Sequence, residues 1–524
     1  MAAGTQEKHA EIQQKTDVAV GDSAAYASEE ASDMMKLNAK GVDEAGAFAD
    51  AHGIVVDPET NKRILRKIDF RLMPIMCGLY LLQYLDKVTL SYAAVMGIRT
   101  DTGMNNSDYS WAGSIFYLGY LVFSYPHNRL MQILPIAKYM SVMVLIWGAV
   151  LCLTALVHDV AGMMATRFFL GAGEGSITAG FVLITSQWYT IAEQPFRTGI
   201  WFTFNGMAQI VGGAIAFGVS RGLEQHPIGV ASWKFLFIIV GAATFLYGIL
   251  MWFFLPDSPL SAKWLNDEEK HIVVERIRGN QQGIGSKIFK WYQVREAFTD
   301  FRTYLNFLCI VAINIPNGGI TVFFTLMITS YGFSSQQSFL LSMPAGCMQL
   351  IIGWGFPYLA SRTGKRSLMA IICMLLSLFG IGLMTGLARN DPLNARVGQL
   401  FAYYLMIACP ATALIIILST VSSNAAGYTK KTTVNAIVLI GYCVGFLIGP
   451  QTFRDPPYYY NGKYVIIAMY FIGLSCFIAM YLLNKRENAR RDKAWEDAGC
   501  PTQPAGQEFM DLTDHENSYF RYAT

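Results

Sequence analysis

Twelve apolar runs, each long enough to cross a lipid bilayer, divide this chain. About 20 apolar residues span the hydrocarbon core as an α-helix, which satisfies its own backbone hydrogen bonds there. Charged residues make up 15% of the 524 residues, against about 25% in soluble domains, and gather in tails and loops. The sequence therefore predicts an all-α integral membrane protein. The predicted spans are 70–95, 110–130, 139–158, 163–188, 198–220, 233–255, 303–328, 338–360, 367–388, 398–420, 432–453 and 464–484.

A long polar stretch between the sixth and seventh runs splits the chain into two sets of six. Within this stretch, NDEEKHIVVERIRGN predicts an amphipathic surface helix capped by Asn266. The predicted regions are a disordered cytoplasmic tail (1–67), an N-terminal six-helix half (68–256), a cytoplasmic central loop (257–302), a C-terminal six-helix half (303–484) and a cytoplasmic tail (485–524).

Lys and Arg are distributed unequally between the loops on alternate sides of the spans. If the N-terminus is inside, the inner loops hold several times more of them than the outer loops do. Cytoplasmic loops of membrane proteins carry such an excess. We therefore expect both termini in the cytoplasm.

The fourth run reads ATRFFLGAGEGSITAGFVLITSQWY and holds two charges, Arg167 and Glu174, in its apolar part. A charge in hydrocarbon is costly and is usually retained for function. Seven residues are about two helical turns, so both side chains lie on one face. The pattern indicates an anion site coupled to a proton, or else a structural ion pair that holds the helix in place.

The two residue types suit different tasks. Arg stays charged at any cellular pH, so Arg167 can replace the hydration of a carboxylate substrate. Glu174, in a cavity of low dielectric constant, can take up and release a proton. We expect an anion at Arg167 to favour protonated Glu174, which couples the two in the symport direction. The proton is the expected coupling ion.

The first run contributes an adjacent charged pair, Asp86 and Lys87. Neighbouring side chains point about 100° apart on a helix, so the two face different surroundings. We expect Lys87 to bind substrate and Asp86 to serve proton coupling or helix pairing.

Amide side chains inside the runs are weaker candidates, because hydrogen bonding between helices explains each of them equally well. In INIPNGG, Pro316 predicts a broken helix whose free carbonyls line a cavity. The candidate substrate contacts of this kind are Asn205, Asn314, Asn317 and Asn424.

Several other chemistries are not indicated. The net charge of +3 is too small to suggest nucleic acid, and the nine Cys show no metal-ligand spacing. No nucleophile–base pair or nucleotide loop is visible, so we expect no enzyme, metal or cofactor. The Gly-rich stretches 171–175 and 211–218 predict close helix packing. Asn105 begins a predicted N-glycosylation acceptor sequence.

Two loops resemble the loop signature of major facilitator transporters, Gly followed by Asp-Arg-x-Gly-Arg-Lys. The loop after the eighth run, GFPYLASRTGKRSLM, matches it except that Ser361 stands in place of Asp. The loop after the second run also lacks the acid. The resemblance implies a conformational latch between neighbouring helices, with Arg129, Arg362, Gly364, Lys365 and Arg366 as its residues.

Longer strings resemble the fungal allantoate permease-like group of anion:cation symporters in this superfamily. They are YLLQYLDKVTLSYAAVMGI, RFFLGAGEGSITAGFVLITSQWY, LPDSP, SSNAAGYTKKTT and GYCVGFLIGPQTFRDPPYYYNGKY. The resemblance implies the major facilitator fold, twelve transmembrane helices in two six-helix halves around a midplane site. It implies anion binding by Arg167, proton coupling by Glu174, and a position for Lys87 similar to a first-span Arg. Phe446 stands where relatives often have Asn.

Three functions fit this sequence. The first is proton-coupled uptake of a small organic anion, such as a ureide or a vitamin or nutrient carboxylate, by a monomeric permease of the plasma membrane. The second is export of an organic acid or secondary metabolite. The fifth run, GMAQIVGGAIAFG, lacks the Pro of many exporters, which favours uptake. The third, a non-transporting sensor, is disfavoured because we expect no further domain in the C-terminal tail.

Overall fold

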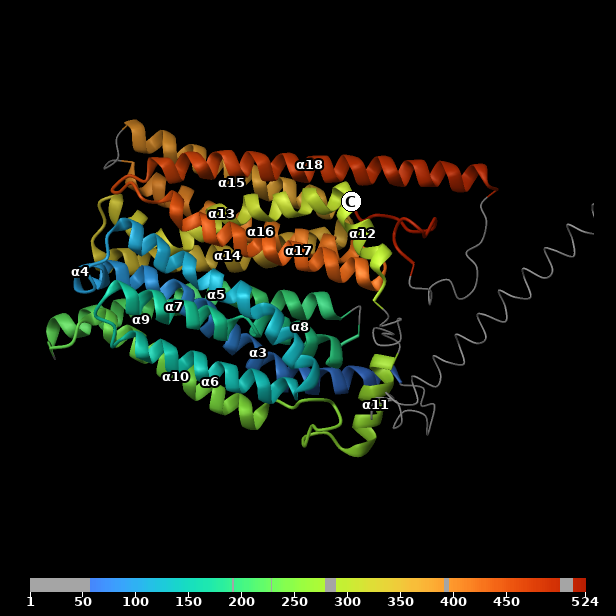
Figure 1. Ribbon diagram of the computed structural model, residues 1–524, viewed down its shortest axis with the longest axis horizontal. Coiled ribbons are helices and arrows are strands. Elements are labelled where there is room, and N and C mark those ends of the chain that lie inside the picture. The colour runs from blue at the N-terminus through green and yellow to red at the C-terminus, as the bar shows by residue number, and fades with distance from the viewer. Residues whose placement is uncertain (1–56, 191–192, 228, 279–288, 391–394, 500–511) are drawn as a thin grey trace, which may run out of the picture.

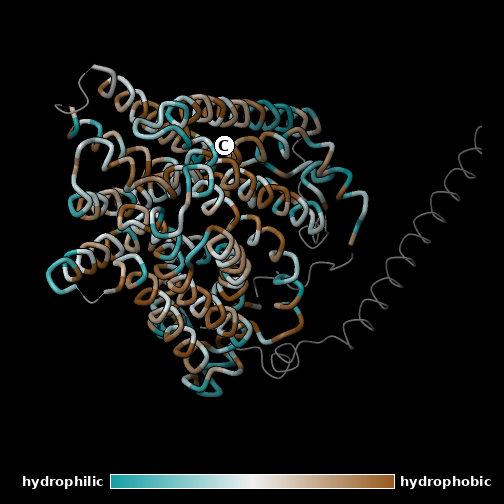
Figure 2. Tube along the Cα trace, turned by 60° about the vertical axis from the view of Figure 1, so that its left-hand side comes forward, coloured by the Kyte–Doolittle hydropathy of each residue, from teal (hydrophilic) through white to brown (hydrophobic). Residues whose placement is uncertain are grey.

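The computed structural model describes the chain except residues 1–56, 191–192, 228, 279–288, 391–394 and 500–511. The described part consists of helices without strands, and the long helices run side by side in one bundle (Figure 1). Apolar residues dominate the middle of the bundle, while hydrophilic residues gather toward helix ends and connections (Figure 2). Large apolar side chains such as Phe253 (75% exposed) and Ile351 (67%) also cover its outside, as a lipid-facing surface requires.

Two groups of helices, consecutive in sequence, form the two parts of the bundle (Figure 1). The first group contains α3 (Pro58–Val95), α4 (Ile98–Asp101), α5 (Asn106–Ile133), α6 (Ile136–Thr154), α7 (Val160–Glu174), α8 (Ile177–Trp188), α9 (Gln194–Gln225) and α10 (Ser232–Phe254). The second contains α13 (Phe301–Ser330), α14 (Ser335–Thr363), α15 (Arg366–Asn390), α16 (Arg396–Asn424), α17 (Tyr428–Ile448), η1 (Gly449–Thr452) and α18 (Tyr460–Asp497).

Ten spans in the described residues are long and apolar enough to cross a membrane, with α7 and α8 counted as one. The helices α3 and α5 are also long, at 38 and 28 residues, but polar side chains make them less apolar. With these two, each group supplies six spans. The predicted fold of twelve transmembrane helices in two sets of six is confirmed.

The two ends of the bundle form two opposite faces. The beginning of α3, the end of α18 and the short helices α11 (Asp267–Arg278) and α12 (Trp291–Thr299) lie toward one face, called here the termini face (Figure 1). The opposite face carries α4 and η1 and is called here the η1 face.

The predicted tail boundaries need correction. The carboxylate of Asp57 accepts hydrogen bonds from the backbone N–H groups of Glu59 and Thr60, and Pro58 occupies the first helical position. Residues 58–67 are therefore the start of α3 and not part of a disordered tail; 1–56 lie outside the described residues. At the other end, α18 continues to Asp497, well beyond the predicted span.

The predicted break at Pro316 is wrong, because α13 runs unbroken from Phe301 to Ser330. A proline in a helix removes one backbone hydrogen bond, and packing of neighbouring helices can hold the helix across that gap. The span that is interrupted is the fourth, where α7 ends at Glu174 and α8 begins at Ile177.

Most glycines of the two stretches predicted to pack helices closely do so, and Gly218, with open space around it, is the exception. A Cβ atom on Gly171 would lie 1.9 Å from the carbonyl oxygen of Phe116, and one on Gly119 would lie 2.2 Å from that of Phe168. The backbones of α5 and α7 therefore touch. In the second Gly-rich stretch, Gly213 of α9 meets the backbone of Phe339 in α14 in the same way.

The two helices of the central loop attach to different groups. The predicted amphipathic helix is α11, which binds the first group through Lys67–Glu269 (2.6 Å) and Arg276–Glu193 (2.8 Å). The other helix, α12, binds the second group, because the side-chain oxygen of Gln293 accepts hydrogen bonds from the first turn of α17. Each group thus carries its own helix at the termini face.

Packing at Gly171 can be tested by adding a methyl group. We expect Gly171→Ala to lower the thermal unfolding temperature of the purified protein, because overpacking costs about 1–3 kcal/mol. Gly218 lies in α9 with open space around it, so Gly218→Ala is the matched control. Equal unfolding temperatures for the two variants would contradict the backbone contact between α5 and α7.

Candidate functional site

Asp86 on α3 lies inside the first helix group. It is fully buried and accepts a hydrogen bond from the indole N–H of Trp147 in α6 at 2.8 Å. Arg167 of α7 is also buried, at 3% exposure, with its guanidinium over the ring of Phe237 in α10. Asp86 and Arg167 carry opposite charges and lie in the same helix group, but they form no direct ion pair, and one carboxylate oxygen of Asp86 is buried without a hydrogen-bond partner.

The predicted alternative of an Arg167–Glu174 ion pair is not found. Glu174, the last residue of α7, forms its ion pair with Lys87 of α3. Two nitrogens of Arg167, Nε and one terminal nitrogen, are buried without a hydrogen-bond partner. Among these four charges, Lys87 and Glu174 form a direct ion pair, while Asp86 and Arg167 are buried without one, an arrangement that spacing along one helix did not reveal.

Lys87 and Glu174 lie where the two helix groups meet. Glu174 is fully buried, whereas the Lys87 side chain keeps 14% of its surface exposed. Its ammonium lies 5.8 Å from the ring centroid of Phe116 in α5, and the next residue of α5, Tyr117, stacks on Phe446 of α17 in the second group. Of these four charged residues, Lys87 has the side chain best placed to meet a ligand that enters between the groups.

Hydrogen bonds between the groups cluster toward the η1 face in the described part of the chain. The hydroxyls of Ser91 and Thr325 are 2.8 Å apart, and the Tyr109 hydroxyl donates to the carbonyl of Val322 at 2.7 Å. Closer to the charged pair, Phe446 stacks on Tyr117 with ring centroids 4.3 Å apart. An aromatic contact between the groups therefore occupies the position where relatives often have Asn. This side of the molecule is closed above the Lys87–Glu174 pair.

The predicted amide contacts fall in different places. Asn205 of α9 and Asn317 of α13 are half-buried. Asn314 is fully buried, donates to the Ile310 carbonyl within its own helix and packs against Gly445 of α17. Asn314 therefore serves packing within the second group.

Asn424 lies at the termini-face end of α16. Its amide exchanges two hydrogen bonds with the backbone of Ala523, at 2.7 and 3.1 Å. The structure therefore uses this predicted substrate contact to bind the C-terminal segment.

The residues of the predicted latch lie on the termini face. Gly364 ends α14 in the left-handed conformation (φ +69°), which glycine adopts without strain. Arg366 donates to the hydroxyls of Ser419 and Ser423 and so joins α15 to α16. Arg362 and Arg129 bond within their own helices, to Tyr358 and Gln132 respectively, and Lys365 is exposed; the latch remains a prediction.

One acid with a structural task was not singled out from the sequence. Asp257, in the LPDSP string after α10, accepts hydrogen bonds from the backbone N–H groups of Ala137 and Lys138 at 2.9 and 3.2 Å. It therefore caps the start of α6, whose own N-cap, Pro135, cannot do so. The sequence signal that could have predicted this cap is an acid just after one span together with a helix start in the same group that lacks a capping residue. Nothing in the sequence marked Trp147 as the partner of Asp86.

Asn105 is exposed and caps α5, its side-chain oxygen accepting from the Asp108 N–H at 2.9 Å. Asn105 lies in the loop before α5, and its glycosylation stays a prediction.

The buried charges of Asp86 and Arg167 can be tested by removing one and then both. We expect Asp86→Asn to destabilise the protein by about 1–3 kcal/mol, because the buried Arg167 loses an opposite charge in the same low-dielectric interior. The double variant Asp86→Asn/Arg167→Gln should recover part of this loss, measured as thermal unfolding temperature. Asp159→Asn, an exposed helix cap, is the control. Losses that add without recovery would refute an electrostatic coupling between the two residues.

The amino-acid sequence is similar to those of known membrane transporters over most of its length. The sequence profile described as Major Facilitator Superfamily matches residues 76–450. An uncharacterized transporter of Schizosaccharomyces pombe is 42% identical over 94% of this chain and 95% of its own length. The allantoate permease of Saccharomyces cerevisiae is 38% identical over 92% of this chain and 90% of its own.

Solved structures agree at the level of fold. The D-xylose–proton symporter superimposes with a TM-score of 0.61 at 13% identity, covering 79% of this chain and 97% of its own. A bacterial homologue of the human lysosomal transporter Spinster, in an inward-facing and unoccupied conformation, gives 0.56 at 15% identity, covering 77% and 95%.

Proposed function

Because this chain belongs to the major facilitator superfamily and its relatives are membrane transporters rather than enzymes, we propose that it takes up a small organic anion together with a proton. The proposal rests on one observation, the Lys87–Glu174 ion pair at the boundary between the helix groups. The name of the allantoate permease, a related chain, supports a carboxylate-bearing ureide or similar nutrient as substrate.

The ion pair couples the anion to the proton through competition for one cation. A substrate carboxylate that reaches the ammonium of Lys87 takes the place of the Glu174 carboxylate. Glu174 is then a buried charge without a partner, which costs several kcal/mol, and protonation removes this cost. Anion and proton are thus bound together. When the substrate leaves, Glu174 recovers Lys87 and releases its proton.

Arg167 has a supporting role in this scheme. It is buried within the first group, where its positive charge contributes to the electrostatic potential around the site; the hydrogen bond from Trp147 to Asp86 joins α6 to α3. For Arg167 itself to bind the substrate, the substrate would have to reach its unpartnered nitrogens from the boundary between the groups.

The sidedness follows from the distribution of basic residues. We place the termini face in the cytoplasm, where loops rich in Lys and Arg belong. The hydrogen bonds that close the η1 face then form the outer gate, and in this conformation the space between the two groups is closed toward the outside of the cell. The protein would work as a monomer in the plasma membrane, since each chain holds both halves of its own pathway.

Uptake of labelled organic anions by cells that express the protein tests the proposal. We expect one compound to accumulate more at an outside pH of 5 than at 7.5. We expect Glu174→Gln to abolish accumulation and its pH dependence while exchange of substrate across the membrane continues. Lys87→Met should raise the half-saturating concentration about tenfold or more, because hydrogen bonds to charged groups contribute roughly 1.5–3 kcal/mol.

A matched control is Glu268→Gln, which neutralises an exposed carboxylate in the first turn of α11. It should leave uptake unchanged. If Glu174→Gln transports with the wild-type pH profile, the coupling role of Glu174 is wrong. If preloaded compound leaves cells faster than from controls and none accumulates, the protein is an exporter.

A further inference from the structure

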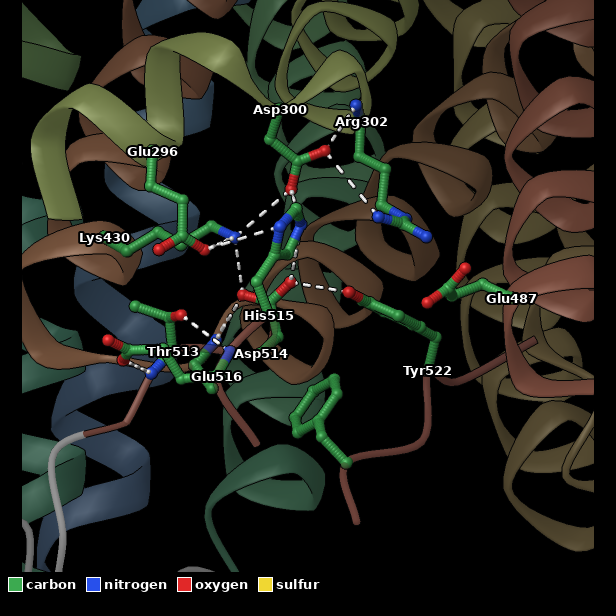
Figure 3. Close-up of polar contacts among 12 residues, drawn as sticks. Glu296, Asp300, Arg302, Lys430, Glu487, Thr513, Asp514, His515, Glu516 and Tyr522 are labelled. Atoms are coloured by element: carbon green, nitrogen blue, oxygen red, sulfur yellow. Dashed lines mark hydrogen bonds and ion pairs between the residues drawn. The ribbon is translucent and has the colours of Figure 1, made fainter. Parts of the chain in front are cut away.

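The C-terminal segment 512–524 folds back onto the termini face of the second helix group (Figure 3). Its Asp514 is fully buried and forms an ion pair of 2.7 Å with Lys430 at the start of α17. The same ammonium lies 2.9 Å from a carboxylate oxygen of Glu296 in α12 and 3.2 Å from one of Asp300 before α13. One buried lysine therefore connects three segments that are distant in sequence.

The end of the segment is held by side chains of two further helices. The backbone N–H and carbonyl of Tyr522 bond the amide of Asn488 in α18 at 2.9 and 2.8 Å. The next residue, Ala523, bonds Asn424 of α16 through its N–H and carbonyl, and its carbonyl also accepts from Asn484 of α18 at 3.3 Å. The segment thus contacts α12, α13, α16, α17 and α18.

Tyr522 occupies the centre of this contact (Figure 3). Its hydroxyl donates to the second carboxylate oxygen of Asp514 at 2.7 Å. The guanidinium groups of Arg302 and Arg491 lie over its ring, 4.0 and 4.9 Å from the centroid. Cation–π contacts of this kind contribute about 0.5–2 kcal/mol each. The contact is therefore largely polar and charged, and it depends on the protonation of its groups.

The charges in this cluster are unequal when His515 is neutral. Three carboxylates, those of Glu296, Asp300 and Asp514, face two cations, Lys430 and Arg302, the latter 3.7 Å from Asp300. Two other charged groups nearby have partners outside this cluster. Arg491 pairs with Glu487 in α18, and the Glu516 carboxylate accepts a hydrogen bond from the backbone N–H of Thr513.

His515 is the titratable group that can correct this imbalance. Its Nε2 lies 3.4 Å from the Asp300 carboxylate and 3.7 Å from that of Asp514, and Nδ1 lies 3.8 Å from Glu296. Its side chain is 46% exposed, so protons reach it freely. A protonated His515 supplies the third cation.

Asp300, Asp514 and His515 also converge in the manner of a metal-binding set. The ammonium of Lys430 is already in contact with both carboxylates, at 2.7 and 3.2 Å. A divalent cation there would be repelled by the lysine. The cluster is therefore built around an internal cation.

We propose that residues 513–523 form a pH-sensitive strap, which docks on the termini face when His515 is protonated and loosens when it is neutral. The strap fastens the ends of α16 and α17 to α12, α13 and α18. All of these helices belong to the second group or are attached to it, so the docked strap holds their termini-face ends together and stabilises that group.

The sign of the pH effect follows from the docked environment. The hydrogen bond with Asp300 raises the pKa of His515, although partial burial opposes it. Burial acts to raise the pKa of Asp300, but hydrogen bonds from His515 and the Arg302 backbone, together with the charge of Lys430, hold it well below its usual range. Docking is thus favoured below about pH 6.5, the ordinary pKa of histidine, and is lost as pH rises through the raised value. Acid in the cytoplasm, which proton uptake produces, would dock the strap.

Distance measurement between spin labels tests the strap without any substrate. Labels on Ser518→Cys in the segment and Thr299→Cys at the end of α12 are placed in full-length protein in which Cys347 and Cys500 are serine; Ser518 and Thr299 are exposed. We expect the short-distance population to fall at least twofold between pH 6 and pH 8. His515→Gln should remove this pH response, and Asp514→Asn should lower the docked population at both pH values.

The control is His226→Gln, an exposed histidine after α9. It should keep the wild-type pH response. A docked population that does not change with pH, or a wild-type response in His515→Gln, overturns the strap. Thermal unfolding at pH 6 tests its consequence: Asp514→Asn should unfold at a lower temperature than wild type, and equal temperatures would refute the stabilisation. Neither outcome depends on Glu174, so the proposed coupling stands or falls separately.

Discussion

A buried carboxylate paired with a partly exposed lysine is the interaction around which this molecule is organised. Glu174 is fully buried at the end of α7, and Lys87 of α3 is the cation that pairs with it. The close contact of α5 and α7 through Gly171 and Gly119 sets the position of α7, which carries Glu174, relative to α5. Any ligand that binds Lys87 changes the free energy of the charged Glu174, which is the physical basis of the proposed coupling.

Asp86 and Arg167 place two further charges in the interior of the first helix group, without a direct ion pair between them. Trp147 donates to the acid, and Phe237 lies beneath the guanidinium. Charges in hydrocarbon are costly unless they are paired and hydrogen-bonded. These contacts therefore offset only part of the cost, and two nitrogens of Arg167 remain buried without a hydrogen-bond partner.

The termini face is built differently from the η1 face. At the η1 face, direct hydrogen bonds join the two groups, as between Ser91 and Thr325. At the termini face, each group is bound by short segments of the chain: α11 on the first, and α12 with the C-terminal segment on the second. Polar contacts of this kind respond to pH and ionic strength, whereas packed glycines do not. The proposed pH-sensitive strap thus lies on the termini face, and the proposed outer gate lies on the η1 face.

Hydropathy and charge bias determined the membrane class, the twelve spans, the central amphipathic helix and the presence of charged residues in the first and fourth spans, because spanning length and the cost of buried charge act locally along the chain. Only the tertiary structure decided which charges pair: helical periodicity placed Arg167 and Glu174 on one face, but α7 ends at Glu174 and the neighbouring α3 supplies the cation. The role of Asn424 and the binding of Asp514 to Lys430 were likewise hidden, because both join residues that are far apart in the sequence. Asn424 and Ala523, for example, are 99 positions apart. Side-chain pairing across helices depends on how the helices pack, and a single sequence carries no local signal for it.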